Sequence, residues 1–174
     1  MTLAGFGFAF ACAALSLSVV GAAAEPPSIV IRGDYKIGQF PVKGDGTLGG
    51  LITAFGEPAA RAHTSWGCLA RWPAVGLAVN LYNLGGFDPC SRHGNFHDAV
   101  LTGRLWVTAK GLRIGDSLAR LQTLFPRARA YGAWRWLVAR YYPVGTPGYY
   151  PWLEAKIVRG HVTAFRVQYP AGGD

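Results

Sequence analysis

Two short stretches of the chain share a hydrophobic spacing that predicts a helix. Apolar residues recur at intervals of three or four positions, as on one helix face: they are Leu48, Leu51, Ile52 and Phe55 in the first stretch and Leu118, Leu121 and Phe125 in the second. A residue suited to capping the helix N-terminus, Thr47 or Ser117, precedes each stretch, and a proline follows each one. We therefore expect helices over about 47–55 and 117–125.

Most of the remaining pattern predicts strands. Residues 76–83 place Leu77, Val79 and Leu81 alternately with more polar positions, which is the period of a half-buried strand. Further strands are expected at 28–37, 62–72, 99–109, 133–142, 152–158 and 161–169, the last two joined by a tight turn at Arg159-Gly160. Residues 84–98 contain several glycines and a proline and predict a long loop.

The first 24 residues differ in composition from the rest of the chain. They carry no charge, are apolar from about residue 3 to residue 20, and end in Ala22-Ala23-Ala24, which fits a cleaved signal peptide. An uncleaved anchor of roughly 20 apolar residues, a buried helix, or lipoprotein processing at Cys12 are the alternatives. We expect a secreted or periplasmic, cell-envelope protein without a stable membrane span after signal cleavage.

Removal of the signal peptide leaves two cysteines, Cys68 and Cys90. An even pair in an exported chain predicts a disulfide. Closing a loop of about twenty residues would stabilise the fold by roughly 3 kcal/mol. A thiol nucleophile or half of a metal site are the other interpretations, and both suit an oxidising compartment poorly.

The two helical stretches belong to a longer self-similarity at an offset of about seventy residues. At that offset Thr47 corresponds to Ser117, and Trp66 to Trp136. This predicts an α+β fold of two related halves, 25–110 with the disulfide loop and 111–174, each a short capped helix followed by antiparallel strands. The helices would pack on the sheet, with Trp66 and Trp136 in the core.

The second helical stretch also carries a family resemblance. Its pattern Ile114-Gly115-Asp116-Ser117-Leu118, continued by Leu121 and Leu124-Phe125-Pro126 and echoed at 47–58, resembles the tandem repeat of the β-lactamase-inhibitory-protein and outer-membrane-lipoprotein superfamily. The resemblance implies an exported α+β protein that binds other proteins through an exposed sheet and loops. The chain lacks the lipidation motif of the lipoprotein branch, and none of its residues aligns with a known inhibitory contact.

The net charge of +8 favours an acidic partner, such as an anionic wall polymer, lipid head groups or an acidic protein surface. Export argues against nucleic acid. Aromatic and basic residues interleave in the second half, and these are the residue types enriched at binding hot spots. The candidate binding residues are Arg135, Arg140, Tyr141, Tyr142, Tyr149, Tyr150 and Trp152. We expect a protein-binding or inhibitor-like role, with binding of glycan or anionic wall polymer as the alternative.

Catalytic motifs are weaker. Gly115-Asp116-Ser117-Leu118 spells the nucleophile motif of the GDSL hydrolases, and His161 is the only histidine that follows it. Val158 stands where that family has its aspartate, so a small serine esterase ranks third and we expect no enzyme activity.

The spacing of the histidines gives little support to a metal site. His93 and His97 lie four residues apart, near Asp88 and Asp98, but that spacing brings two imidazoles together only on a helix. Gly94 and the composition of the loop argue against a helix here. We therefore expect neither a metal nor a cofactor.

The helix-cap interpretation makes a direct prediction. Replacing Ser117 by Ala removes the hydroxyl that would accept a backbone hydrogen bond, so the free energy of unfolding should fall by about 1 kcal/mol. Urea unfolding of both proteins measures the difference, and an unchanged midpoint would rule out the cap.

Overall fold

A computed structural model describes residues 28–32, 36–42, 46–83, 85–132, 135–140 and 152–169. The strands are β1 (Ile29–Arg32), β2 (Lys36–Ile37), β3 (Phe40–Pro41), β4 (Ala60–Thr64), β5 (Gly67–Trp72), β6 (Leu77–Tyr82), β7 (Asn95–Leu101), β8 (Trp106–Thr108), β9 (Arg129–Tyr131), β10 (Arg135–Arg140), β11 (Trp152–Val158) and β12 (His161–Gln168). The helices are α1 (Leu48–Phe55), α2 (Leu118–Leu124) and a 3₁₀ turn at Pro73–Val75.

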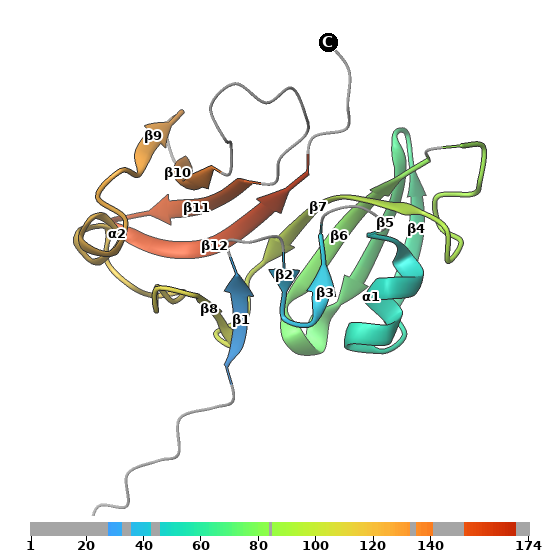
Figure 1. Ribbon diagram of the computed structural model, residues 1–174, viewed down its shortest axis with the longest axis horizontal. Coiled ribbons are helices and arrows are strands. Elements are labelled where there is room, and N and C mark those ends of the chain that lie inside the picture. The colour runs from blue at the N-terminus through green and yellow to red at the C-terminus, as the bar shows by residue number, and fades with distance from the viewer. Residues whose placement is uncertain are drawn as a thin grey trace, which may run out of the picture.

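The strands form two sheets (Figure 1). The large sheet has the order β4-β5-β6-β7-β12-β11-β10-β9, and all its neighbours are antiparallel. The small sheet has the order β3-β2-β1-β8, in which β1 and β8 are parallel. Strands β7 and β12 are the two central strands of the large sheet, although they lie far apart in the sequence.

The expected α+β fold of two helix-capped halves is wrong. The protein is mostly β, because about half of its described residues lie in strands and only two α-helices, of eight and seven residues, occur among them. Local spacing identified both helices. It missed the second sheet, which 29–41 builds with 106–108, and the strand that begins at Asn95 inside the expected loop.

Both expected helix caps are confirmed. The Thr47 hydroxyl accepts a hydrogen bond from the backbone N–H of Gly50 at 3.2 Å, and the Ser117 hydroxyl accepts one from Arg120 at 3.1 Å. These bonds satisfy N–H groups that have no partner within the helix. Leu51 of α1 and Leu121 of α2 are fully buried, so each helix is held by its apolar face.

The helices and the small sheet cover one face of the large sheet (Figure 1). The predicted alternation along β6 is confirmed: Leu77, Val79 and Leu81 are buried, while the residues between them are half-buried. Together with Ile31 and Leu48 these side chains belong to one core cluster. The opposite face of the large sheet is consequently free of this packing.

The two tryptophans expected in the core behave differently. Trp136 packs against the core cluster, but Trp66 is 90% exposed, so its predicted burial is wrong. The segment 62–72, expected as one strand, folds instead into the β4–β5 hairpin, in which Thr64 pairs with Gly67. Trp66 occupies the turn of this hairpin, where no core is within reach.

The Cys68–Cys90 disulfide is confirmed, with its Cα atoms 5.1 Å apart. It attaches the loop before β7 to the buried face of β5, where Cys68 is 1% exposed. In the same loop the Asp88 carboxylate accepts a hydrogen bond from the backbone N–H of Cys90, which shapes the turn. None of the helices in the described ranges has the length and apolar character needed to cross a membrane.

Close packing at the β4–β5 turn generates a stability prediction. A Cβ atom added to Gly67 would lie 2.0 Å from the carbonyl oxygen of Leu81 on β6, and only a backbone shift can relieve that overlap. Gly67→Ala should therefore lower the free energy of unfolding by about 2 kcal/mol or more, as overpacked sites do.

The matched control is Ser65→Ala in the same turn, which is exposed and should change the free energy of unfolding by no more than about 0.5 kcal/mol. Equal stability of the Gly67→Ala variant and the wild type in urea unfolding would contradict the close approach.

Candidate binding face

Alternate residues of strands β6, β7, β12 and β11 lie together on the face of the large sheet that faces away from the core. On β6 these are Ala78, Asn80 and Tyr82, which alternate with buried leucine and valine. Cross-strand pairing extends the face across the sheet, because Asn80 pairs with Asp98 on β7, and Arg166 on β12 pairs with Glu154 on β11. We call this surface the open face.

A β-bulge changes the alternation on β7. Asn80 pairs with Asp98 but Leu81 pairs with Phe96, so His97 is an extra residue on β7. As a result His97 and Asp98 both reach the open face. The Nδ1 atom of His97 lies 2.9 Å from a carboxylate oxygen of Asp98, and its ring stands edge-on to that of Tyr82 with the centroids 5.6 Å apart.

Asp98 is the best-satisfied charge on this face. Its side chain is almost completely buried, yet the carboxylate accepts hydrogen bonds from Asn80 at 3.0 Å and from the Nε of Arg166 at 3.0 Å, besides the contact with His97. Burial works to raise the pKa of Asp98, but hydrogen bonds from His97 and Arg166 outweigh it and lower the pKa below its usual value. Asp98 is therefore ionised at neutral pH.

Glu154 has a different environment. It is 3% exposed, and its closest cationic atom in the described ranges, the Nη1 of Arg135, lies 3.9 Å from Oε2. No group in those ranges donates a hydrogen bond to this buried oxygen. Glu154 lines a depression of about 340 Å³ together with Asn80, Asp98, Arg135, Lys156 and Arg166. We call Asp98, Arg166, Glu154 and Arg135 the charged row.

The candidate binding residues predicted from the sequence are only partly placed. Arg135 belongs to the charged row. At the other end of the same ladder the backbone of Arg140 pairs with Trp152, which is half-buried and whose indole N–H is buried without a hydrogen-bond acceptor in the described part of the chain. The four candidate tyrosines, Tyr141, Tyr142, Tyr149 and Tyr150, lie outside the described residues.

The positive charge is unevenly distributed along the chain. Residues 1–100 contain six basic and six acidic residues, whereas 101–174 contain eleven basic and three acidic residues, a difference that equals the net charge of +8. Part of this positive charge lies on the open face. Arg129 of β9 pairs there with Leu137, and Arg135 of β10 pairs there with Lys156. The β9 side of the open face is accordingly its basic side.

Ser117 and His161 are close in space but are not arranged as a nucleophile and its base. Their backbones form an isolated β-bridge, while the Ser117 hydroxyl accepts the capping bond of α2. The His161 Nδ1 atom instead lies 3.1 Å from the carbonyl oxygen of Gly115. In this arrangement the imidazole contacts a backbone carbonyl, and the hydroxyl caps the helix.

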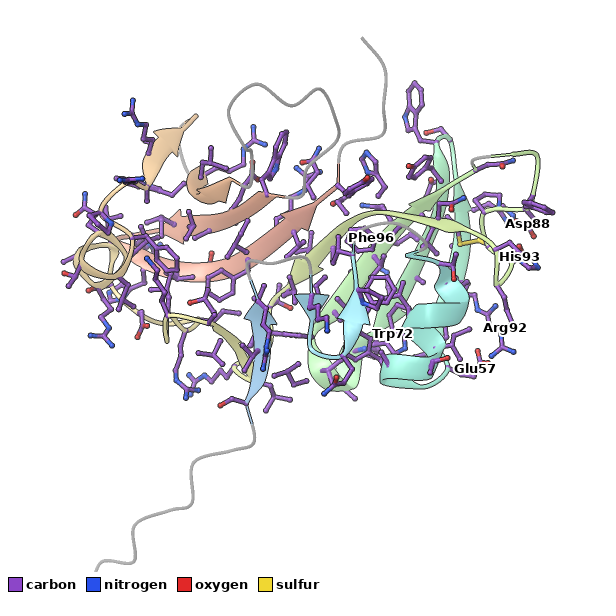
Figure 2. All side chains as sticks on the ribbon, in the orientation of Figure 1. Glu57, Trp72, Asp88, Arg92, His93 and Phe96 are labelled. Atoms are coloured by element: carbon purple, nitrogen blue, oxygen red, sulfur yellow. A yellow bond between two sulfur atoms is a disulfide. The ribbon has the colours of Figure 1, made fainter. Side chains whose placement is uncertain are left out.

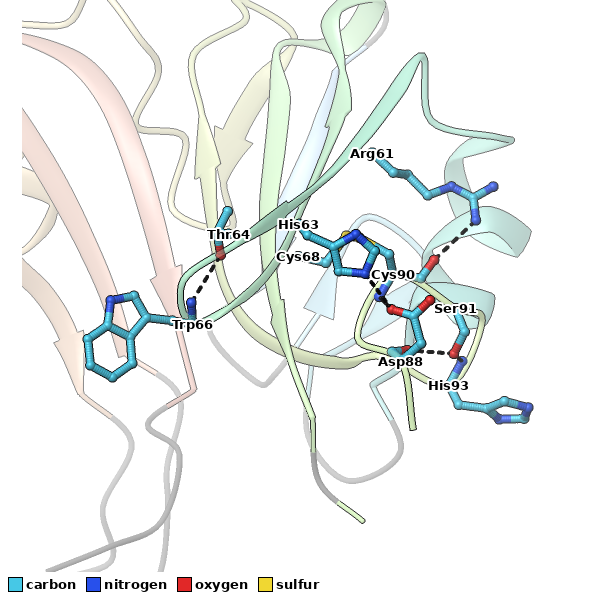
Figure 3. Close-up of a disulfide and its surroundings, with 9 residues drawn as sticks. All are labelled: Arg61, His63, Thr64, Trp66, Cys68, Asp88, Cys90, Ser91 and His93. Carbon is cyan, nitrogen blue, oxygen red and sulfur yellow. Dashed lines mark hydrogen bonds and ion pairs between the residues drawn. A yellow bond between two sulfur atoms is a disulfide. The ribbon is translucent and has the colours of Figure 1, made fainter. Parts of the chain in front are cut away.

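The histidines near the disulfide do not form the metal site that their spacing allowed. His93 packs on Phe87, whereas His97 contacts Asp98 on the open face. Within the described ranges the one group of three potential ligands is His63, Asp88 and Cys90, but the sulfur of Cys90 is used in the disulfide (Figure 3). His63 and Asp88 are hydrogen bonded to each other at 2.8 Å.

Sequence reasoning missed most of the charged row. The local pattern indicates Asp98 only as a possible metal ligand in a loop, and it places Glu154 and Arg166 in strands without a role. One indication was available, because Glu154 is an acidic residue within the apolar run of β11, and a buried charge needs a partner. Asp98 meets Arg166 because β7 and β12 are neighbours in the sheet. The local sequence pattern does not show that these two strands are adjacent.

Comparison of the chain with family models, with curated proteins and with solved structures finds no match. Functional inference therefore depends on the geometry of the open face.

The environment of Asp98 predicts how stability depends on pH. Its pKa in the folded protein lies below the usual value of 3.8, so its carboxylate stabilises the fold above that pH and loses this contribution as the pH falls through the folded-state pKa. Asp98→Asn should lower the free energy of unfolding by about 2 kcal/mol at neutral pH. The difference from wild type should shrink below pH 3.8.

Urea unfolding at neutral and acidic pH measures both effects. Glu57→Gln is the matched control, because Glu57 forms an exposed pair with Arg61 that contributes less than about 1 kcal/mol. A difference between Asp98→Asn and wild type that stays constant down to the lowest pH would contradict this account.

Proposed function

We propose that this protein is a secreted, non-catalytic binding protein of the cell envelope or extracellular space, and that it binds another protein through its open face. The observation that carries this proposal is the buried Oε2 atom of Glu154, which receives no hydrogen bond from the described residues although it lines an open depression. Leaving a buried acceptor unpaired costs roughly 1–3 kcal/mol. Docking of a partner that lets this oxygen turn toward a hydrogen-bond donor would recover that cost.

The charged row is already arranged for such a contact. Arg166 is held by Asp98, and Arg135 faces Glu154, so ordering these side chains costs little when a partner arrives. Charged groups that are held in place by neighbours give an interface its specificity and its orientation. The basic side of the open face favours a partner surface with net negative charge.

A non-catalytic role is consistent with the surroundings of Ser117. Its hydroxyl caps α2, and the His161 imidazole contacts backbone, so neither group is prepared for proton transfer to the other. Turnover of a model ester that disappears in Ser117→Ala would revive the esterase interpretation.

The proposal is tested by capturing partners from an envelope and culture-medium extract on immobilised protein comprising residues 25–174. The wild type should retain a discrete protein that the double variant Arg135→Ala/Lys156→Ala does not retain. Both residues line the depression next to Glu154, so their removal alters this site. Because it also removes the cation that faces the buried Glu154 carboxylate, circular dichroism first verifies that the variant folds. Elution in salt steps reports how strongly the charges contribute.

The matched control is Arg61→Ala. It also removes a cationic side chain, but from an exposed ion pair near α1, and it should leave capture unchanged. Retention of polysaccharide alone, released by salt, would favour the anionic-polymer alternative. Equal capture by the wild type and the double variant would exclude the depression beside the charged row as the binding site. A further variant, Tyr149→Ala/Tyr150→Ala, tests the predicted tyrosines in the same assay.

A further inference from the structure

Trp66 is the most exposed large apolar side chain in the described part of the chain, at 90%. It sits in the β4–β5 turn, and its indole points away from the disulfide (Figure 3). It lines a depression of about 480 Å³ on the open face together with Thr64, Asn80, Tyr82, His97 and Asp98. This volume falls within the roughly 300–1,000 Å³ that small-molecule sites occupy.

The turn that carries Trp66 is held in place by its neighbours. Gly67 lies so close to the Leu81 carbonyl that no side chain fits between them, and the next residue, Cys68, is tied to Cys90. The backbone N–H of Trp66 also lies 3.4 Å from the hydroxyl of Thr64. The indole is therefore displayed on a rigid support, which reduces the entropy lost when a ligand covers it.

The floor of the depression offers hydrogen-bonding groups of both kinds. Because the Asp98 carboxylate only accepts, the Nδ1 atom of His97 must donate to it, which leaves Nε2 as an acceptor when the ring is neutral. Asn80 uses one N–H toward Asp98 and keeps its second N–H and its carbonyl oxygen. The hydroxyls of Thr64 and Tyr82 can both donate and accept.

These groups restrict the chemistry of the ligand. An anion would meet the Asp98 carboxylate, and a cation would compete with Arg166 for it. An apolar ligand would strip water from Asn80 and His97 without replacing its hydrogen bonds. A pyranose ring carries C–H groups that pack on an aromatic face and hydroxyls that donate and accept at its edge. From this complementarity we propose that the Trp66 depression binds a neutral saccharide of one or two pyranose rings.

The experiment titrates the mature protein with glucose, galactose, mannose, N-acetylglucosamine and their β-linked disaccharides, followed by tryptophan fluorescence and by NMR. At least one sugar should shift the emission of the exposed indole to shorter wavelength, with a saturable response and a dissociation constant of about 1 mM. Raising the salt concentration should leave the affinity unchanged, since the contacts are uncharged. No response to any of these sugars overturns the proposal.

Variants locate the binding. Trp66→Ala should weaken the affinity by about tenfold or more, and because the side chain is 90% exposed the variant should fold normally, which circular dichroism verifies. Phe87→Ala is the matched control, since Phe87 is 55% exposed and belongs to the disulfide loop. Undiminished affinity in Trp66→Ala, or an equal loss in Phe87→Ala, overturns the assignment. Asn80→Ala provides a second variant that should also weaken binding.

Saccharide binding is separable from the proposed protein binding. The variant Arg135→Ala/Lys156→Ala alters the neighbouring depression and should bind sugar with wild-type affinity. Loss of sugar binding in this variant would place the ligand in the charged row and overturn the assignment to Trp66. Failure to capture a protein partner would not affect the sugar titration.

Discussion

The ion pair between Asp98 and Arg166 joins the two central strands of the large sheet. Its donor and acceptor lie 3.0 Å apart, and the carboxylate is almost fully buried, so its charge depends on Arg166 for compensation. Backbone pairing continues across the same boundary between Leu101 and Phe165. At this boundary strands β4–β7, built before residue 102, meet strands β9–β12, built after residue 128, and the open face depends on their meeting in this register.

The two depressions of the open face follow from that arrangement. Both are lined by Asn80 and Asp98, one extending toward the basic strands and the other toward Trp66. The side-chain view shows Trp72 and Phe96 on the opposite, packed side (Figure 2), where both are buried. The same sheet thus separates an apolar core from a polar surface, and the alternation of its strands, interrupted at the β7 bulge, places each side chain on one or the other.

Local features of the fold could be predicted from the sequence, whereas long-range ones could not. Three kinds of local feature are predicted and are present: the caps at Thr47 and Ser117, the disulfide, and the alternation of β6. The caps and the alternation depend on a few neighbouring residues, and the disulfide follows from there being two cysteines to pair. The predicted α+β class is wrong because a capped helix of two turns is easy to recognise in a sequence, although it accounts for only a few residues of the fold. The predicted burial of Trp66 is wrong because it depends on the alignment with Trp136, and two tryptophans at corresponding positions need not have the same surroundings. The charged row required knowledge of which distant strands are neighbours.

The parallel pairing of β1 with β8 also bears on how the chain folds. Ile31 is 2% exposed, and its strand is covered on one side by β8, where Ile29 pairs with Trp106. As the chain is synthesised from its N-terminus, β1 therefore has no partner on that side until β8 follows, after strands β4–β7 of the large sheet. Contacts between such distant segments slow folding, because loop closure has to precede any gain from burial. The small sheet should accordingly be among the last parts of this protein to acquire its native structure.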